Sequence, residues 1–227
     1  MTKTNARLFR LGLFAAAAVV FSVYAVSRYD YGWVAGYDFG IFDQVVRAYA
    51  DFRAPLVSLK GDGFNIWADH FHPLVALWAP FYWLWSDPRM LLIAQSLTVA
   101  LAVFPVHRFA ARRWDGRWAK LFTVGVMAAW PVQCLIDFNV HEVAFAVPLL
   151  AWAVEAMDRR GRGSLLAAAG LLTLTREDMG AVVACLGAVY TAGAWRRRRA
   201  VRRLGAGPDP TSADGRDLAV GLTLAVA

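Results

Sequence analysis

The segment Tyr37-Asp38-Phe39-Gly40-Ile41-Phe42-Asp43-Gln44 separates two apolar runs and decides the fold of this chain. It lies in a polar region, residues 28–89, that holds seven of the 17 acidic residues and two of the four histidines. Hydrophobic residues make up 59% of the chain as a whole. We therefore expect a polar loop between apolar helices, and its acids and histidines are candidates for a chemical site.

The composition is that of a membrane protein. Repeated long apolar runs and ten tryptophans place the chain outside the profile of a soluble globular domain. The net charge of +7 does not indicate a nucleic-acid partner, because the basic residues cluster at the ends of apolar runs, where bilayer topology explains them. Cys134 and Cys185 lie inside apolar runs without paired spacing and carry no redox information. The predicted fold class is an all-α, polytopic membrane protein.

About six transmembrane helices are predicted. A helix needs about 20 residues, at 1.5 Å each, to cross a hydrocarbon core about 30 Å thick. We expect a transmembrane domain over residues 1–203, a disordered linker over 204–216 and the start of a further, truncated span over 217–227. The expected spans, of which the fifth is short, are residues 11–27, 90–107, 118–136, 143–157, 164–175 and 180–195.

Two helices that do not span the membrane are predicted within residues 28–89. Apolar residues recur at helical spacing from Ile41 to Phe52, with polar residues on the opposite face, which indicates an amphipathic helix on the membrane surface. Asp38 stands just before its expected start. The apolar run 73–85 would be only about 20 Å long as a helix, and its Trp and Tyr residues favour an interfacial position.

The charges predict which loops share a side of the membrane. With the N-terminus in the cytoplasm, 17 of the 24 Lys and Arg residues fall on the cytoplasmic side. The outer segments, residues 28–89, 137–142 and 176–178, then hold 11 of the 17 acids. This distribution follows the positive-inside rule. We therefore expect a multi-pass protein of the plasma (inner) membrane with its N-terminus inside.

The three outer segments are expected to meet at one membrane face, where they would form a site. Carboxylates act as general bases or metal ligands, and arginine neutralises phosphate. The candidate residues are Asp38, Asp43, His70, His72, Asp137, His141, Glu142, Arg176, Glu177 and Asp178.

Several candidates also have a purely structural explanation. Asp38 could cap the helix that follows it, and Asp43 could lie on the solvated face of that helix. Asp137 and His141 are four residues apart, which would put them on one face if the loop is helical and is compatible with metal or substrate binding. Exposure to water in a loop is the alternative for both.

Four motifs in order resemble a known family. They are Tyr37–Gln44, His70-Phe71-His72-Pro73-Leu74, Asn139-Val140-His141-Glu142 and Leu174-Thr175-Arg176-Glu177-Asp178-Met179-Gly180. Over about residues 5–195 this combination resembles a bacterial family of predicted membrane proteins known as domain of unknown function 2079. A first span, a long outer loop with an acidic motif and a second span ending in Arg-Arg are similar to the GT-C superfamily of integral membrane glycosyltransferases.

The GT-C resemblance implies a polyprenyl-phosphate-linked sugar as donor, transferred with inversion at the anomeric carbon. Asp38 matches the aspartate that binds the acceptor hydroxyl or acts as its general base, although Phe39 stands where several GT-C families have a second acid. Arg176 matches a basic residue that meets the lipid phosphate. The remaining candidates are expected to bind a divalent metal ion, Mg²⁺ or Mn²⁺ (Asp137, His141 and Glu142), or the substrate (His70, His72, Glu177, Asp178 and Asp43).

A noncatalytic role is the alternative, either as a transporter or as a scaffold in an envelope complex. In that case the same charged side chains would have a gating or binding role instead of a catalytic one. The chain shows no inverted repeat, and its ionisable residues gather at one surface and not at the bilayer midplane. Both observations count against a transporter.

Overall fold

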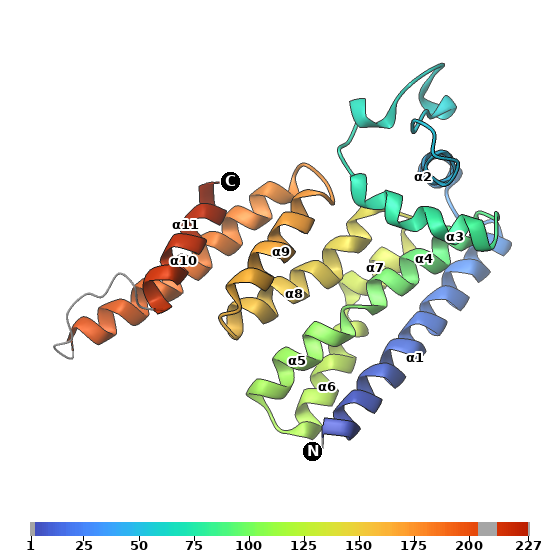
Figure 1. The fold of residues 1–227 in the computed structure, drawn as a ribbon. Helices are drawn as coiled ribbons and strands as arrows, with labels where there is room; N and C mark the ends of the chain where they lie inside the picture. Colours follow the sequence, from blue (N-terminus) through green and yellow to red (C-terminus); the bar gives the residue numbers. More distant parts are fainter. Residues whose placement is uncertain (1–2, 204–212, 227) are drawn as a thin grey trace.

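The computed structural model describes residues 3–203 and 213–226, and within these ranges its regular secondary structure is helical (Figure 1). The all-α prediction is confirmed. Four 3-10 helices, η1 (Ser58–Lys60), η2 (Ile66–Ala68), η3 (Pro73–Trp78) and η4 (Glu142–Phe145), join the α-helices. These are α1 (Lys3–Asp30), α2 (Gly36–Ala50), α3 (Ala79–Leu84), α4 (Arg89–Ala100), α5 (Val103–Arg113), α6 (Gly116–Met127), α7 (Trp130–Asp137), α8 (Ala146–Asp158), α9 (Arg162–Thr173), α10 (Met179–Arg203) and α11 (Ala213–Val226).

Three helical stretches of the described chain are long and apolar enough to cross a membrane. They are Thr4–Asp30, the joined helices α4 and α5 (Arg89–Arg113), and the joined helices α6 and α7 (Gly116–Asp137). They coincide with the first three predicted spans. Helices α8 and α9 have only 13 and 12 residues, or about 20 Å, and α10 ends in a run of arginines. The coarser prediction of a membrane protein with several apolar helices therefore holds, whereas length and composition together do not confirm six spans in the described chain.

The joined helices α4 and α5 form the centre of the bundle. They pack against α1, α6, α7 and α8, and Leu91, Ala94 and Val99 are fully buried there. Helix α1 instead turns Val19 and Val23 outward, with about 60% of each residue exposed. An apolar outer face is what a helix in contact with lipid requires.

Short local signals set the element boundaries. The Asp115 carboxylate accepts hydrogen bonds from the backbone N–H groups of Arg117 (3.1 Å) and Trp118 (3.2 Å) and so caps the start of α6. Pro131 occupies the first turn of α7, where its missing N–H costs no hydrogen bond.

The polar segments gather at one end of the bundle, which we call the loop end. Residues 28–89, the turn between α7 and η4, and the turn between α9 and α10 all lie there (Figure 1). An ion pair of 3.3 Å between Arg28 and Asp137 ties two of these segments together. The N-terminus, the α5–α6 turn and the α8–α9 turn lie at the opposite end, the N-terminal end, where Arg112 contacts Asp158 at 2.9 Å. The predicted grouping of the loops is thus confirmed.

The predicted amphipathic helix is α2, but its start differs from the prediction. It begins at Gly36, so Asp38 lies inside its first turn, and neither Ala35 nor any other side chain caps it. The buried residues Phe42 and Val45 face the bundle, while Phe52 lies beyond the helix and is 86% exposed. The second predicted helix in this region is continuous from η3 into α3, and it is too short to span.

The C-terminal helix corrects one predicted boundary. Helix α11 packs on α10, and its buried Asp217 binds Arg162, Arg197 and Tyr190. Disorder was expected over 204–216, which is wrong for 213–216; residues 204–212 lie outside the described ranges. A buried carboxylate with three partners fixes this helix in place.

The structure predicts that Glu155→Gln destabilises the fold. The Glu155 side chain is 2% exposed at the N-terminal end, and its carboxylate lies 2.9 Å from Arg112, 3.2 Å from Arg159 and 3.7 Å from Arg108. Neutralising it leaves these cations without a shared partner. Because the arginines are partly exposed, we expect a loss of about 2 kcal/mol.

Thermal unfolding of the purified protein in detergent would measure this loss. Asp62→Asn is the matched control, since Asp62 is an exposed acid in a loop. Equal melting temperatures for both variants would contradict the structural role of Glu155.

Candidate functional site at the loop end

Glu142 is the buried centre of the loop end. It is the first residue of η4, and only 2% of its side chain is exposed. One carboxylate oxygen lies 2.8 Å from Nδ1 of His141, and the other lies 3.4 Å from Nη1 of Arg176. Burial raises the pKa of Glu142, but the hydrogen bond and charge of His141 outweigh it and leave that pKa below its ordinary value. Glu142 is therefore an ionised anchor.

A polar residue of α4 holds the turn that presents Glu142. Oε1 of Gln95 accepts a hydrogen bond of 2.7 Å from the backbone N–H of His141, and the Gln95 amide donates to the carbonyl of Asn139. Gln95 is 1% exposed. A buried amide in an apolar span is costly unless it is hydrogen-bonded. The two hydrogen bonds of Gln95 fix the path of residues 139–141.

Arg176 joins Glu142 to the surface. Its Nε donates to Asp178 over 2.8 Å, and a second guanidinium nitrogen also contacts that carboxylate. These contacts raise the pKa of Arg176, while Arg176 lowers the pKa of Asp178. The Asp178 side chain is 48% exposed, in contrast to Glu142. The guanidinium thus lies between one buried and one exposed carboxylate.

Glu177 ties the same turn to the outer loop. Nδ1 of His70 lies 2.7 Å from one oxygen of Glu177, and the backbone N–H of Phe71 donates to the other over 3.1 Å. The bond to His70 lowers the pKa of Glu177. A backbone hydrogen bond of 3.4 Å, from the N–H of Leu74 to the carbonyl of Leu174, joins the same two segments. Half of each side chain of the His70–Glu177 pair remains open to solvent.

His72 is buried between these segments. It is 2% exposed, its ring centroid lies 5.7 Å from that of Phe42, and Nδ1 has no hydrogen-bond partner. Burial lowers the pKa of His72, although the charge of Glu142 opposes this. Phe42 also contacts the ring of His141 at 5.8 Å. One aromatic side chain of α2 thus packs on two histidines from different segments.

We call this assembly the polar cluster. It brings together seven of the ten predicted site residues, which are His70, His72, His141, Glu142, Arg176, Glu177 and Asp178.

Asp43 and Asp137 are used elsewhere. The Asp43 carboxylate accepts hydrogen bonds from Arg47 (2.9 Å) and from the Tyr82 hydroxyl (2.6 Å), which joins α2 to α3. Asp137 accepts one from Tyr24 and pairs with Arg28, both on α1. Both carboxylates therefore join helices to one another, and neither is part of the polar cluster.

Asp38 is not part of the hydrogen bonds and ion pairs that form the polar cluster in the described part of the chain. It is exposed and stands one helical turn before Phe42, so both residues share a face of α2. The Lys60 amino group is hydrogen-bonded to Asp69. That bond and the charges of Asp69 and Asp38 raise the pKa of Lys60. Asp69 in turn precedes His70 in the chain. Lys60, which the sequence patterns did not single out, carries positive charge near Asp38.

The predicted metal group is not assembled. Asp137 is held by α1, and Glu142 is committed to His141 and Arg176. Among residues 3–203 and 213–226 no three His, Cys, Asp or Glu side chains are placed to hold a metal ion. The residues present do not fit Mg²⁺ or Mn²⁺.

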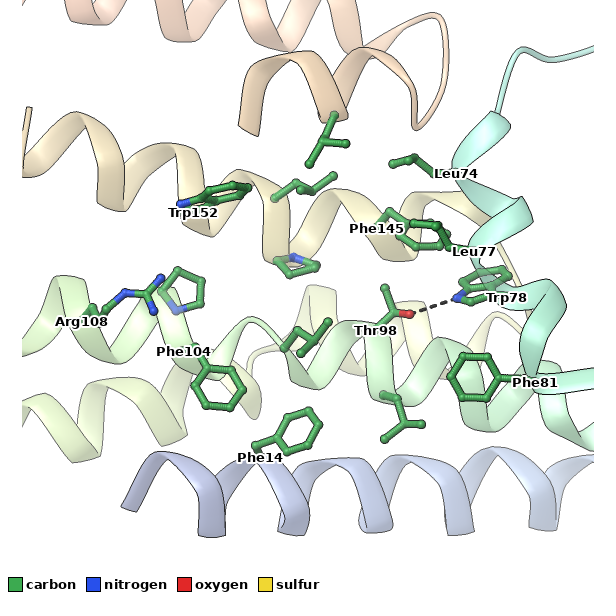
Figure 2. A pocket seen from close by; sticks show the side chains of 16 residues that line it. Phe14, Leu74, Leu77, Trp78, Phe81, Thr98, Phe104, Arg108, Phe145 and Trp152 are labelled. Atoms are coloured by element: carbon green, nitrogen blue, oxygen red, sulfur yellow. Dashed lines mark hydrogen bonds between the residues drawn. The ribbon is translucent and has the colours of Figure 1, made fainter. Parts of the chain in front are cut away.

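An apolar groove of about 590 Å³ reaches the segments that carry the polar cluster. The segments that line its outer part also carry the cluster: Leu74 follows His72, and Phe145 follows Glu142 by one turn. The groove runs between the α1–α4–α5 layer and α8–α9, and Arg108 and Trp152 lie at its far end (Figure 2). Arg108 is the only charged residue in its lining. Sequence patterns did not predict this groove, because it forms between helices that are distant in the chain.

Residues 33–223 match the model of a family described as a predicted membrane protein, DUF2079. The chain belongs to the DUF2079 family. This confirms the family resemblance seen in the sequence motifs, and all seven residues of the polar cluster fall inside the matched range of the DUF2079 model. No curated protein and no solved structure is significantly similar to the chain.

The burial of His72 predicts loss of stability in acid. Because its pKa is below 6.5 in the folded state, the unfolded state takes up a proton first as the pH falls. The contribution of neutral His72 is complete above pH 6.5 and declines below it. The melting temperature in detergent should therefore fall between pH 7.5 and pH 5.5.

His72→Phe, which keeps a ring against Phe42, should reduce this fall. The pKa values of Glu142 and Glu177 are below 4.5, so these acids add little in that window. An unchanged pH dependence in His72→Phe would show that His72 is not the titrating group.

Proposed function

We propose that this DUF2079 protein is a glycosyltransferase of the GT-C type, which moves a sugar from a polyprenyl-phosphate donor to an acceptor hydroxyl. The observation that carries the proposal is the position of the polar cluster at the outer end of the apolar groove. A lipid-linked sugar needs both environments side by side, one for its phosphate and sugar and one for its hydrocarbon chain.

The groove supports a lipid substrate over a water-soluble one. Its wall is formed by side chains such as Leu77, Phe104 and Leu171, which bury the prenyl chain away from water. Trp78 closes the wall near the cluster and is fixed by a hydrogen bond of 3.0 Å from its ring nitrogen to Thr98 (Figure 2). The chain would run from the cluster toward Arg108.

Arg176 is the proposed phosphate ligand. Its guanidinium is fixed from below by the buried Glu142 and is shared above with the half-exposed Asp178. A donor phosphate would take the place of Asp178, since bidentate binding suits phosphate as well as carboxylate. His70, His72, Glu177 and Asp178 would then surround the sugar.

Asp38 is the proposed general base. It would accept the proton of the acceptor hydroxyl while the acceptor oxygen forms its bond to the anomeric carbon. The bond from that carbon to the phosphate oxygen breaks, its electron pair stays on the phosphate, and the anomeric configuration inverts. Lys60 and Arg176 supply positive charge on the two sides of this reaction.

The proposed membrane orientation places the loop end outside the plasma membrane and the N-terminus in the cytoplasm. It rests on the bias of basic residues toward the N-terminal end. Helices α8, α9 and α10 would complete six membrane-embedded helices. Because α9 is short, the 174–178 turn would lie below the membrane surface, with residues 28–89 covering it.

Asp38→Asn should lower sugar transfer at least about 100-fold, because amide nitrogen cannot accept the proton. Transfer is measured in membranes that hold the full-length protein, with a panel of radiolabelled polyprenyl-phosphate hexoses. Asp51→Asn is the control, since Asp51 is an exposed acid at the other end of α2.

Full activity of Asp38→Asn would show that Asp38 is not the general base. Absence of transfer by the wild-type protein across the whole panel would favour the noncatalytic alternative.

A further inference from the structure

A second unusual group lies at the N-terminal end, away from the polar cluster. The His107 ring of α5 lies 5.1 Å from the ring of Phe9 on α1, and Nζ of Lys120 on α6 lies 5.3 Å from the Phe9 ring centroid. The charges of Arg10 and Lys120 both act on His107. Three helices thus bring two cations and a histidine together.

His107 is buried without a hydrogen-bond partner. It is 1% exposed, and neither Nδ1 nor Nε2 is hydrogen-bonded. A buried polar group normally finds a partner, because leaving it unpaired costs about 1–3 kcal/mol. The neighbouring cations cannot accept a hydrogen bond, so what this group lacks is an acceptor or an anion.

Acids do not balance this positive charge in the described chain. Neither Arg10 nor Lys120 forms an ion pair in the described chain. Arg108 pairs only weakly with Glu155, because Arg112 and Arg159 lie closer to the Glu155 carboxylate. Asp115, the acid in the nearby α5–α6 turn, caps α6. An anion is therefore favoured at this place.

The surroundings indicate what kind of anion. Four large apolar side chains flank the group and are about half exposed, namely Leu8, Leu11, Trp118 and Leu121. A hollow of about 470 Å³, lined by Gly116, Arg117, Lys120 and Leu121, opens beside them. The group lies at the ends of three spanning helices, where lipid headgroups meet the bilayer core. A charged head with hydrocarbon chains matches both parts of this surface.

We propose that Arg10 and Lys120, which lie around the buried ring of His107, bind the phosphate of an anionic phospholipid, whose acyl chains lie over Leu11, Trp118 and Leu121. Basic pockets between transmembrane helices hold anionic headgroups in this way. The site stabilises the packing of α1 on α5 and α6. It is independent of sugar transfer at the opposite end.

The test is the thermal stability of the full-length protein in neutral detergent with added lipid. Dioleoylphosphatidylglycerol should raise the melting temperature by about 4 °C or more above the value with dioleoylphosphatidylcholine. The gain should disappear in Arg10→Gln/Lys120→Gln. The control Arg196→Gln/Arg199→Gln removes the same charge from α10, away from this site, and should keep the gain.

Three results would overturn the proposal: equal melting temperatures with the two lipids, a full gain in Arg10→Gln/Lys120→Gln, or an equal gain from inorganic phosphate alone. Lys120→Gln by itself tests the site if the double variant does not fold, and it should lose at least half of the gain. His107→Phe keeps the ring contact with Phe9 and both cations, and it should therefore keep the gain.

Discussion

The loop end depends on one buried carboxylate. Glu142 is 2% exposed, and its charge is stable only because His141 and Arg176 reach it from two sides. Arg176 comes from the turn after α9, 34 residues further along the chain. Without the charge of Glu142, the Arg176 guanidinium would lose its fixed position, and the turn that also carries Glu177 would be held to the outer loop alone.

This constraint connects the membrane fold to the proposed chemistry. The central helices α4 and α5 contribute Gln95, which sets the turn before Glu142, and they also form a wall of the apolar groove. The polar cluster and the groove therefore share one scaffold. A substrate with a charged head and a hydrocarbon chain meets both without any large rearrangement of the helices. The opposite end of the bundle uses its own charges differently, with Glu155 binding arginines inside the fold and Arg10 and Lys120 left available to a lipid.

Sequence patterns predicted the parts of this fold that depend on composition and spacing. The first three spans, the amphipathic helix in residues 28–89 and the grouping of the polar loops at one end follow from apolar run lengths and charge bias. The patterns failed where a partner distant in the chain decides the role of a residue. Asp43 and Asp137 were site candidates together with Asp38, yet Tyr82 and Arg28 bind them into helix contacts. Nor can spacing reveal the groove, or the contact of Phe42 with both His72 and His141, because these arise from packing between separate helices.

The central claim is that the ion pair of Glu142 and Arg176 joins the turns after α7 and α9 into one site. A double-mutant cycle tests it directly, with Glu142→Gln, Arg176→Gln and the combined variant compared by unfolding in detergent. The account predicts a coupling energy of at least about 1 kcal/mol, with each single variant nearly as damaging as the pair. Strictly additive effects would contradict it, since they would mean that the two side chains do not interact in the folded protein.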